Sequence, residues 1–159
     1  MRNLYLILSL LLATSASAET ITGRVVSIAD GDTVTILDSS NTQHKIRLAQ
    51  IDAPETGHGR NKPAQPYGEK SKAALADFVF QKTVDADCQT KDRYGREVCK
   101  ILLNGLDVNL EQVKNGMAWV YVKYAREQQY FEAEATVKEK RIGLWADSDP
   151  IAPWEYRHK

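Results

Sequence analysis

Short runs of β-branched and apolar residues, separated by turn-forming residues, recur from Ile21 to Ile51. Ile21 to Ala29 is one such run, Asp32 to Leu37 alternates polar and apolar residues, and Lys45 to Ile51 forms a third. Asp30-Gly31 and the segment Asp38 to Thr42 supply turn residues between them. Runs of this length joined by short turns predict a meander of three strands.

The rest of the chain interleaves helical patterns with two further strand-like segments. The expected elements, in chain order, are a helix at Glu69–Gln81, strands at Thr83–Cys88 and Glu97–Leu103, and helices at Val108–Lys114 and Arg126–Arg141. The sequence contains no internal repeat and no linker, so we expect one domain. Its predicted class is α+β, mainly β: a five-stranded Greek-key barrel of the OB type with about three helices. The tail from Pro150 to Lys159 carries no clear pattern.

Residues 1–18 have the features of a cleaved secretory signal peptide. Arg2 supplies a positive charge, Leu4 to Ala13 is apolar apart from Ser9, and Ala16-Ser17-Ala18 fits the small-residue cleavage site. The apolar run is about ten residues long, roughly half of what a membrane span needs, so an uncleaved anchor is the weaker alternative. We expect an exported protein, periplasmic or secreted, whose mature domain at residues 19–159 does not contact a membrane.

The charge balance limits how the chain could hold an acidic partner. The whole sequence has 21 basic and 21 acidic side chains. Removing residues 1–18 takes away Arg2 and leaves 20 basic and 21 acidic side chains, a net charge of −1. Proteins that grip nucleic acid by bulk electrostatics are usually strongly basic. Any phosphate binding must therefore come from a local cluster. A monomer is the default expectation for the assembly state.

Cys88 and Cys99 are the two cysteines of the chain, and they flank a turn-like segment at residues 91–96. In an oxidising compartment such a pair is expected to form a disulfide, here across a hairpin. Two buried free thiols are the alternative. No paired-cysteine motif or histidine-rich group suggests zinc or redox chemistry. We take His44 and His158 as surface residues, because neither has a partner at metal-ligand spacing.

Acidic residues gather where the first strands are predicted to end. Asp30 and Asp32 flank Gly31, whereas Asp52 and Glu55 flank a segment containing a proline that cannot continue a sheet ladder. The two turns of a meander could bring Asp32 and Asp52 together. Two carboxylates with carbonyl and water oxygens would form a site for a hard cation. Glu55 would then be a carboxylate able to orient or deprotonate water.

Two arginines accompany these carboxylates. Arg47 lies on the third predicted strand, and Arg96 ends the turn between the last two. Guanidinium groups match phosphate oxygens in a two-pronged geometry, so two of them beside a cation suit a phosphodiester. Taken singly, each residue has an ordinary explanation, such as a turn former or a solvated strand face. Their combined order is what is specific.

That order resembles the staphylococcal nuclease (thermonuclease) family. The matching segments are Asp30-Gly31-Asp32-Thr33-Val34, Arg47-Leu48, Ile51-Asp52-Ala53-Pro54-Glu55, Asp92-Arg93-Tyr94-Gly95-Arg96, Val108-Asn109, Gly116-Met117-Ala118 and Gly143-Leu144-Trp145. The resemblance covers about residues 21 to 145. It implies an OB-fold barrel with three helices and calcium-dependent hydrolysis of DNA and RNA. The implied products carry 3′-phosphates, because the bond to the 5′-oxygen is the one broken.

The resemblance also implies a role for each matched position. Asp32 and Asp52 would be calcium ligands, together with the backbone carbonyl of Ala53, where an Ala in place of the family's Thr leaves the ligand atom unchanged. The remaining implied roles are a general base at Glu55, phosphate binding at Arg47 and Arg96, and a nucleotide contact at Tyr94. The near-neutral charge departs from the strongly basic best-known member, which affects tight duplex binding rather than chemistry.

Other residues have less specific signals. Tyr121 and Tyr124 could line the nucleotide cleft, while Trp119 is expected in the core. The loop at residues 57–66 contains His58, Arg60 and Lys62 and could face nucleic acid or be an ordinary solvated loop. The function alternative from another class is a non-catalytic OB-fold module that binds nucleic acid. A calcium protein unrelated to nucleic acid ranks lower, because the chain has no EF-type loop.

Overall fold

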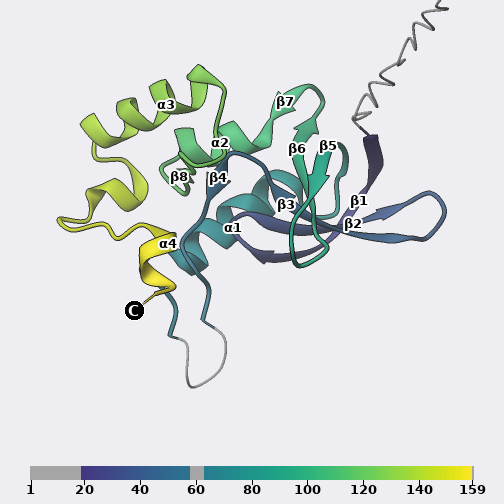
Figure 1. Ribbon diagram of the computed structural model, residues 1–159, viewed down its shortest axis with the longest axis horizontal. Helices are drawn as coiled ribbons and strands as arrows, with labels where there is room; N and C mark the ends of the chain where they lie inside the picture. The colour runs from purple at the N-terminus through teal and green to yellow at the C-terminus, as the bar shows by residue number, and fades with distance from the viewer. Residues whose placement is uncertain (1–18, 58–62, 159) are drawn as a thin grey trace, which may run out of the picture.

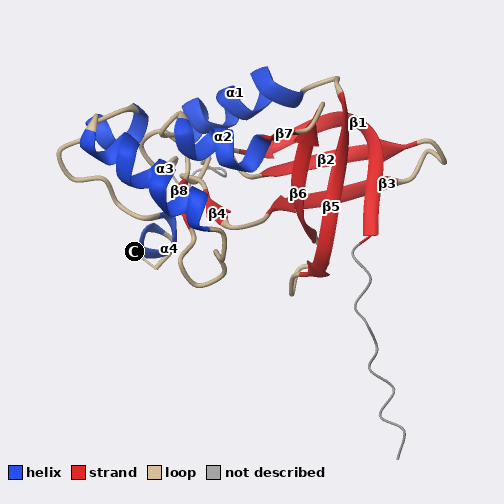
Figure 2. Ribbon diagram, turned by 90° about the horizontal axis from the view of Figure 1, so that it is seen from above, coloured by secondary structure: helices blue, strands red, loops and turns tan. Residues whose placement is uncertain are grey.

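Five strands close into a barrel in the part of the chain that the computed structural model describes, residues 19–57 and 63–158. They are β1 (Glu19–Asp30), β2 (Thr33–Asp38), β3 (Gln43–Leu48), β5 (Thr83–Lys91) and β6 (Glu97–Leu103). The first three form the predicted meander, and β5 and β6 form the hairpin predicted around residues 91–96. The helices gather toward one end of this barrel (Figure 2).

The strand order makes the barrel an OB-type one. β1 pairs antiparallel with both β2 and β5, and β5 pairs antiparallel with β6. β3 then lies parallel to β6, with Arg47 opposite Val98 and Leu48 opposite Cys99, and this pairing closes the barrel. The predicted five-stranded, mainly β fold is confirmed. A closed barrel leaves fewer unpaired strand edges than an open sheet of the same size.

Alternating apolar residues fill the interior. Val34 and Ile36 of β2, and Ile46 and Leu48 of β3, have no accessible surface, as expected for residues two apart on one face of a strand. Leu75 of helix α1 (Gly68–Val79) is equally buried and belongs to the same core cluster. Complete burial of such a side chain contributes about 1.5–3 kcal/mol. The alternation therefore fixes which strand face carries the polar site residues.

Three helices of seven or more residues are described: α1, α2 (Val108–Lys114) and α3 (Gln128–Glu139). A 3-10 turn, η1 (Gly143–Ala146), and a one-turn helix, α4 (Pro153–Tyr156), follow. The prediction of about three helices is confirmed, and α4 gives structure to the tail that lacked a sequence pattern. None of the helices in the described residues has the length and apolar character needed to cross a membrane.

The third predicted strand is shorter than expected. β3 ends at Leu48, Gln50 takes a left-handed conformation with φ of 67°, and Ile51–Asp52 forms a separate short strand, β4. β4 pairs with β8 (Trp119–Val120) rather than with the barrel. The remaining short strand, β7 (Leu106–Asp107), pairs with β6. The break at Gln50 turns the chain out of the barrel, so that Asp52 lies beside the β1–β2 turn.

Cys88 and Cys99 form a disulfide, as predicted, at directly opposed positions of β5 and β6. The bond therefore crosslinks neighbouring strands of the barrel wall. Two sequence predictions lie outside the described residues: the signal peptide at 1–18, and the basic side chains of His58, Arg60 and Lys62.

Candidate active site

The two-residue turn between β1 and β2 places the first acidic residues. The backbone N–H of Asp32 donates to Oδ1 of Asp30 over 3.0 Å, which closes the turn. A Cβ on Gly31 would lie 1.8 Å from Oγ of Ser71 and 2.8 Å from Cβ of Ala53. Only glycine allows α1 and the β4 exit to approach the turn this closely. Asp32 is consequently buried at the end of the barrel.

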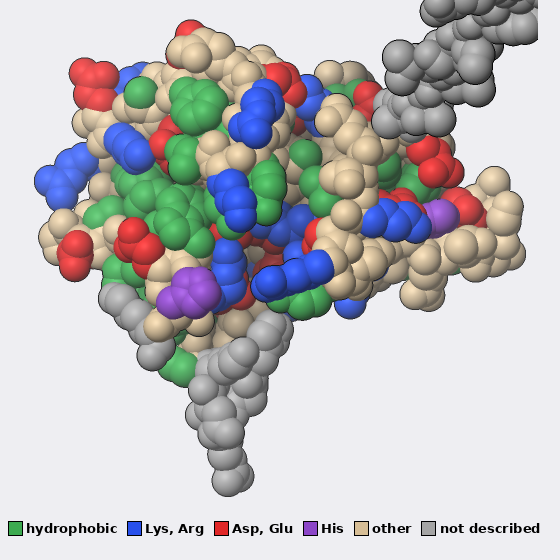
Figure 3. All heavy atoms as spheres, in the orientation of Figure 1, with side chains coloured by type: hydrophobic (Ala, Val, Ile, Leu, Met, Phe, Trp, Pro, Cys, Tyr) green, Lys and Arg blue, Asp and Glu red, His purple; other side chains and the backbone are tan. Residues whose placement is uncertain are grey.

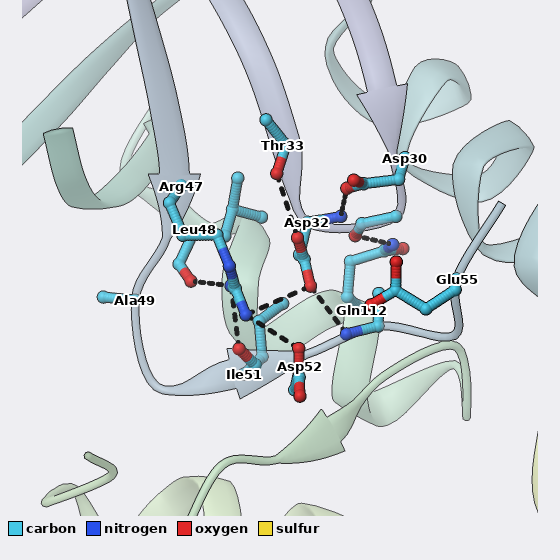
Figure 4. A network of polar contacts seen from close by, with 12 residues as sticks. Asp30, Asp32, Thr33, Arg47, Leu48, Ala49, Ile51, Asp52, Glu55 and Gln112 are labelled. Carbon is cyan, nitrogen blue, oxygen red and sulfur yellow. Dashed lines mark hydrogen bonds and ion pairs between the residues drawn. The ribbon is translucent and has the colours of Figure 1, made fainter. Parts of the chain in front are cut away.

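Arg47 joins the two predicted cation ligands (Figure 4). It lies opposite Thr33 in the β2–β3 ladder, one residue from Asp32. Its Nη2 is 2.9 Å from Oδ1 of Asp52 and 3.3 Å from Oδ2 of Asp32. Its Nη1 donates to the carbonyls of Leu48 at 2.7 Å and Ile51 at 2.9 Å. The same guanidinium therefore shapes the β3–β4 corner and unites the carboxylates.

The segment after β4 adds Ala53 and Glu55. The Ala53 N–H donates to Oδ2 of Asp32 over 2.7 Å, so Asp32 and the Asp52–Ala53 segment are held directly together. Gln65 accepts the Glu55 N–H at 3.1 Å and donates its own N–H to the Glu55 carbonyl at 2.9 Å. Glu55 is half-buried. Arg157 contacts the carboxylates of both Glu55 and Asp52, which shows that the two lie on the same side of the cluster.

Arg96 approaches from the β5–β6 turn. Asp92 organises that turn: its Oδ1 accepts the N–H groups of Tyr94 and Arg96, and its Oδ2 pairs with Nε of Arg96 at 2.7 Å. Nη1 of Arg96 donates to Oγ1 of Thr33 over 3.3 Å, next to Asp32 in sequence. Tyr94 is 68% exposed and stacks with Arg93 and Arg96 at its face. Arg96 thus joins the site, and Tyr94 projects from its rim.

A third arginine enters from the C-terminal end of the chain. Nη2 of Arg157 is 2.7 Å from Oδ2 of Asp52, and Nη1 is 3.2 Å from Oδ1 of the same carboxylate. Nη1 also pairs with Oε1 of Glu55 at 2.5 Å. The prediction from sequence omits this residue, because the tail has neither a periodic pattern nor a matching motif.

Two buried polar residues also escape the sequence reading, although they position the turn. Gln112 of α2 donates to the carbonyls of Gly31 at 2.8 Å and Ser71 at 3.1 Å. Ser71 in turn donates its hydroxyl to the carbonyl of Met117 at 2.6 Å. A signal for Gln112 exists in hindsight: it lies four residues after the buried Val108, on the same helical face.

Electrostatics show an excess of carboxylates in this pocket. Burial, reinforced by repulsion from Asp32, raises the pKa of Asp30 to about 7. Burial likewise raises the pKa of Asp52, against the opposing effect of its hydrogen bonds to Arg157. Burial alone would lower the pKa of Arg47, yet the adjacent Asp32 and Asp52 raise it. Carboxylates whose charge is penalised in this way fit a hard cation, which prefers oxygen ligands.

The aromatic residues form a cluster on the α4 side of the site. Tyr121 stacks on Trp154 with ring centroids 5.4 Å apart and planes at 6°, and it meets Tyr124 edge-on at 5.0 Å. Trp119 is half-buried against Trp145, at 4.3 Å. Tyr124 is 56% exposed. One face of Tyr121 is therefore already covered by the tail, whereas Tyr124 remains accessible.

The surface around these residues is hollowed. Figure 3 shows Lys and Arg side chains gathered around acidic side chains in a depression on this face, between the C-terminal segment and the barrel. The positive charge is local, as the near-neutral composition requires. Carboxylates at the floor and guanidinium groups around them can bind a cation and an anion next to each other.

Comparisons with known proteins agree with this arrangement. Residues 45–147 match the family model described as staphylococcal nuclease homologue. A Haemophilus influenzae protein named "uncharacterized endonuclease" is 42% identical over 154 residues, covering 97% of this chain and 83% of that protein. A Shigella flexneri protein named "micrococcal nuclease" is 34% identical over 146 residues, covering 85% and 79%. An Arabidopsis thaliana protein named "staphylococcal-like nuclease CAN1" is 39% identical over 113 residues, covering 71% and 33%.

Proposed function

The chain belongs to the family of staphylococcal nuclease homologues, and on this basis we propose that it is an exported, calcium-dependent nuclease. Its substrates are DNA and RNA, and it hydrolyses their phosphodiester bonds to leave 3′-phosphate ends. One observation carries the proposal: Asp32, Asp52 and Glu55 converge with Arg47 and Arg96 at one end of the barrel, from four separate segments of the chain.

The residues present suit a calcium ion. Asp32 and Asp52 would hold it, with the carbonyl of Ala53, because these oxygens lie on two chain segments that a hydrogen bond already joins. Burial, together with repulsion from Asp32, raises the pKa of Asp52, and a divalent cation would offset both effects. When bound, calcium would neutralise phosphate charge and bring the substrate beside Glu55.

The protein's own groups then supply the remaining chemistry. Glu55 orients the attacking water through its carboxylate and accepts a proton from it. Arg96 extends from a turn that Asp92 holds in place through hydrogen bonds to the Arg96 backbone and side chain. Its guanidinium is therefore positioned in advance to stabilise the negative charge that develops on the phosphate oxygens. Arg47 holds the carboxylates of Asp32 and Asp52 in place and adds positive charge to the site. The attack is in line with the departing 5′-oxygen.

The first experiment is hydrolysis of heat-denatured DNA by purified residues 19–159, with calcium and then with excess chelator. We expect cleavage that requires calcium and leaves 3′-phosphates. Glu55→Gln and Arg96→Ala should each lower kcat by about 10²–10³, as expected when one charge-stabilising group is lost. Arg24→Gln is the matched control, because Arg24 is exposed and hydrogen-bonded to Gln81.

Other outcomes would decide against the proposal. A folded protein that binds DNA without cleaving it would be the non-catalytic OB-fold module. Cleavage that persists in chelator would rule out the assignment of Asp32 and Asp52 as ligands of a required calcium ion. An unchanged kcat in both Glu55→Gln and Arg96→Ala would show that neither Glu55 nor Arg96 takes part in the reaction.

Export is the second part of the proposal. The disulfide supports it, because such bonds persist in oxidising compartments outside the cytosol. We propose that residues 1–18 are removed during export to the periplasm or the medium and that the mature chain acts as a monomer. Mass spectrometry of protein recovered from each compartment should give a chain beginning at Glu19, and light scattering should give the mass of one chain. Retention of residues 1–18 in membranes would instead indicate an anchor.

A further inference from the structure

The C-terminal segment is docked against the active site. Trp154 stacks on Tyr121 at 5.4 Å and meets Trp119 edge-on at 5.7 Å. The hydroxyl of Tyr156 donates to the carbonyl of Pro63 over 3.0 Å, and Gln65 donates to the carbonyl of Ile151 over 2.6 Å. α4 is therefore held from both the β8 side and the loop after Glu55. The next residue after α4 is Arg157.

Docking gives Arg157 a defined place over the two carboxylates. Its guanidinium contacts both oxygens of Asp52 and one oxygen of Glu55, at 2.5–3.2 Å. Asp52 is almost completely buried, with 1% of its side chain exposed, whereas the Arg157 side chain is 39% exposed. The Arg157 guanidinium thus lies between the buried Asp52 carboxylate and solvent.

The other two arginines of the site are less available to bind a substrate phosphate. Arg47 has 12% of its side chain exposed and directs its two terminal nitrogens to two carbonyls and two carboxylates. Arg96 is 24% exposed, but its Nε is committed to Asp92. The Arg157 side chain is the most exposed of the three. Its fork geometry also matches two phosphate oxygens at once.

We propose that Arg157 is a substrate-binding residue whose guanidinium holds the phosphodiester during the reaction. This inference rests on the proposed function, since it concerns the same site. Asp52 cannot give the same oxygens fully to a cation and to Arg157. Once the cation takes Asp52, the guanidinium is released from that carboxylate but stays tethered by α4. The anion drawn to the cation then becomes its partner.

The direct test is binding of an uncleavable ligand in calcium. The probe is a ten-nucleotide single-stranded phosphorothioate DNA, checked by mass spectrometry to be intact after each titration. Arg157→Gln should raise Kd about 10- to 100-fold, the range expected for loss of a hydrogen bond to a charged group. Arg157→Lys, which keeps the charge without the fork, should lie between. Arg24→Gln removes the same group elsewhere and should leave Kd unchanged.

A second measurement uses no substrate. If Arg157 and calcium compete for Asp52, calcium titration by calorimetry should show tighter binding in Arg157→Gln than in the unaltered protein. Equal or weaker calcium binding would overturn the exchange at Asp52. Circular dichroism would check that the variant folds, and tryptophan fluorescence, to which Trp154 contributes together with Trp119 and Trp145, would check that α4 is docked. If the Gln variant does not fold, the Lys variant carries both measurements.

The outcomes separate this inference from the function on which it rests. Cleavage and tight DNA binding by the unaltered protein, with the same Kd in Arg157→Gln, would overturn the role of Arg157 and leave the nuclease intact. An unaltered protein that neither binds nor cleaves DNA would overturn both. A rise in KM with little change in kcat for Arg157→Gln would place its contact in the bound ground state as well as in the transition state.

Discussion

At the scale of single residues, some side chains of the site both hold the backbone in place and contact the other charged groups of the site. Arg47 donates to the carbonyls of Leu48 and Ile51 and also pairs with Asp52. Truncating it would leave the buried carboxylates of Asp32 and Asp52 without this counterion, which is costly. Loss of activity in an Arg47 variant would therefore not isolate catalysis. Arg96 and Glu55 are better probes, because both are more exposed.

The motif residues were predictable from their combined order along the chain, whereas the residues that contact them were not. Asp32, Asp52 and Arg96 stand in short, ordered segments that the sequence shows directly. Arg157 and Gln112 act through contacts with residues 105 and 81 positions away. Such contacts leave no local spacing to detect. They depend on where α4 and α2 finally pack.

His44 provides a pH-dependent prediction at this scale. Its side chain is partly exposed, at 19%, and Nε2 lies 2.9 Å from Oδ2 of Asp38, with Glu97 on its other side. The hydrogen bond with Asp38 raises the pKa of His44 above its ordinary value. The imidazolium therefore stabilises the fold fully below about pH 6.5, and this contribution disappears as the pH rises through the raised pKa.

We expect His44→Gln to lower Tm by a few degrees at pH 5 and by much less at pH 9. Thermal unfolding followed by circular dichroism across this range gives the comparison. In an Asp38→Asn background the pH dependence of the His44 effect should shrink, because the main partner has lost its charge. A Tm difference that is constant from pH 5 to 9 would show that the pair contributes no proton-linked stability.

At the scale of elements, the strand and helix positions follow from alternation and helical spacing, but the break between β3 and β4 could not be predicted in this way. The prediction runs the third strand through Ile51, whereas β3 ends at Leu48 and β4 pairs with β8. Gln50 is left-handed, and its side-chain oxygen accepts the N–H groups of Arg126 and Glu127 at the start of α3. A tertiary cap of this kind overrides local strand preference. These bonds hold the two residues before α3, which begins at Gln128 rather than at the predicted Arg126.

Gly31 tests the packing of the β1–β2 turn against α1. Gly31→Ala places a methyl group 1.8 Å from Oγ of Ser71, so we expect a loss of about 1–3 kcal/mol in the free energy of unfolding. Calcium affinity should fall too, because Asp32 must move with the turn. Urea unfolding and calcium calorimetry measure the two effects. Combining the change with Ser71→Gly removes the clashing side chain and should recover part of the stability; strictly additive losses would refute the clash.

The Cys88–Cys99 bond tests how far the barrel wall relies on its crosslink. The two residues are 11 positions apart, and closing a loop of that size stabilises a fold by about 3 kcal/mol in the chain-entropy model. Reductant should lower the free energy of unfolding by about that amount while leaving kcat at 25 °C unchanged, since both sulfurs are outside the site. The Cys88→Ala, Cys99→Ala double variant is the control, and its stability should not respond to reductant.

At the scale of the whole molecule, a near-neutral chain must bind a polyanion through few contacts. Residues 19–159 carry a net charge of −1, so long-range attraction to nucleic acid is weak. The barrel concentrates its useful positive charge by closing β3 onto β6, which brings Arg47 and Arg96 to the same end, and by folding the tail back to deliver Arg157. Composition alone would therefore give the wrong expectation about a nucleic-acid partner.

The salt dependence of binding tests this account quantitatively. Each phosphate neutralised on a single strand contributes about −0.7 to the slope of log K against log salt concentration. Two or three arginine contacts thus predict a slope of about −1.4 to −2.1 for the phosphorothioate DNA in calcium. Arg96→Ala should make the slope shallower by about 0.7, whereas Arg24→Gln should not change it. A slope near −4 would mean that basic groups outside the site carry much of the binding. Repeating the titration with Arg60→Gln and Lys62→Gln together would then show whether residues 57–66 supply them, because a loop that contacts phosphates must lose slope when its charges are removed.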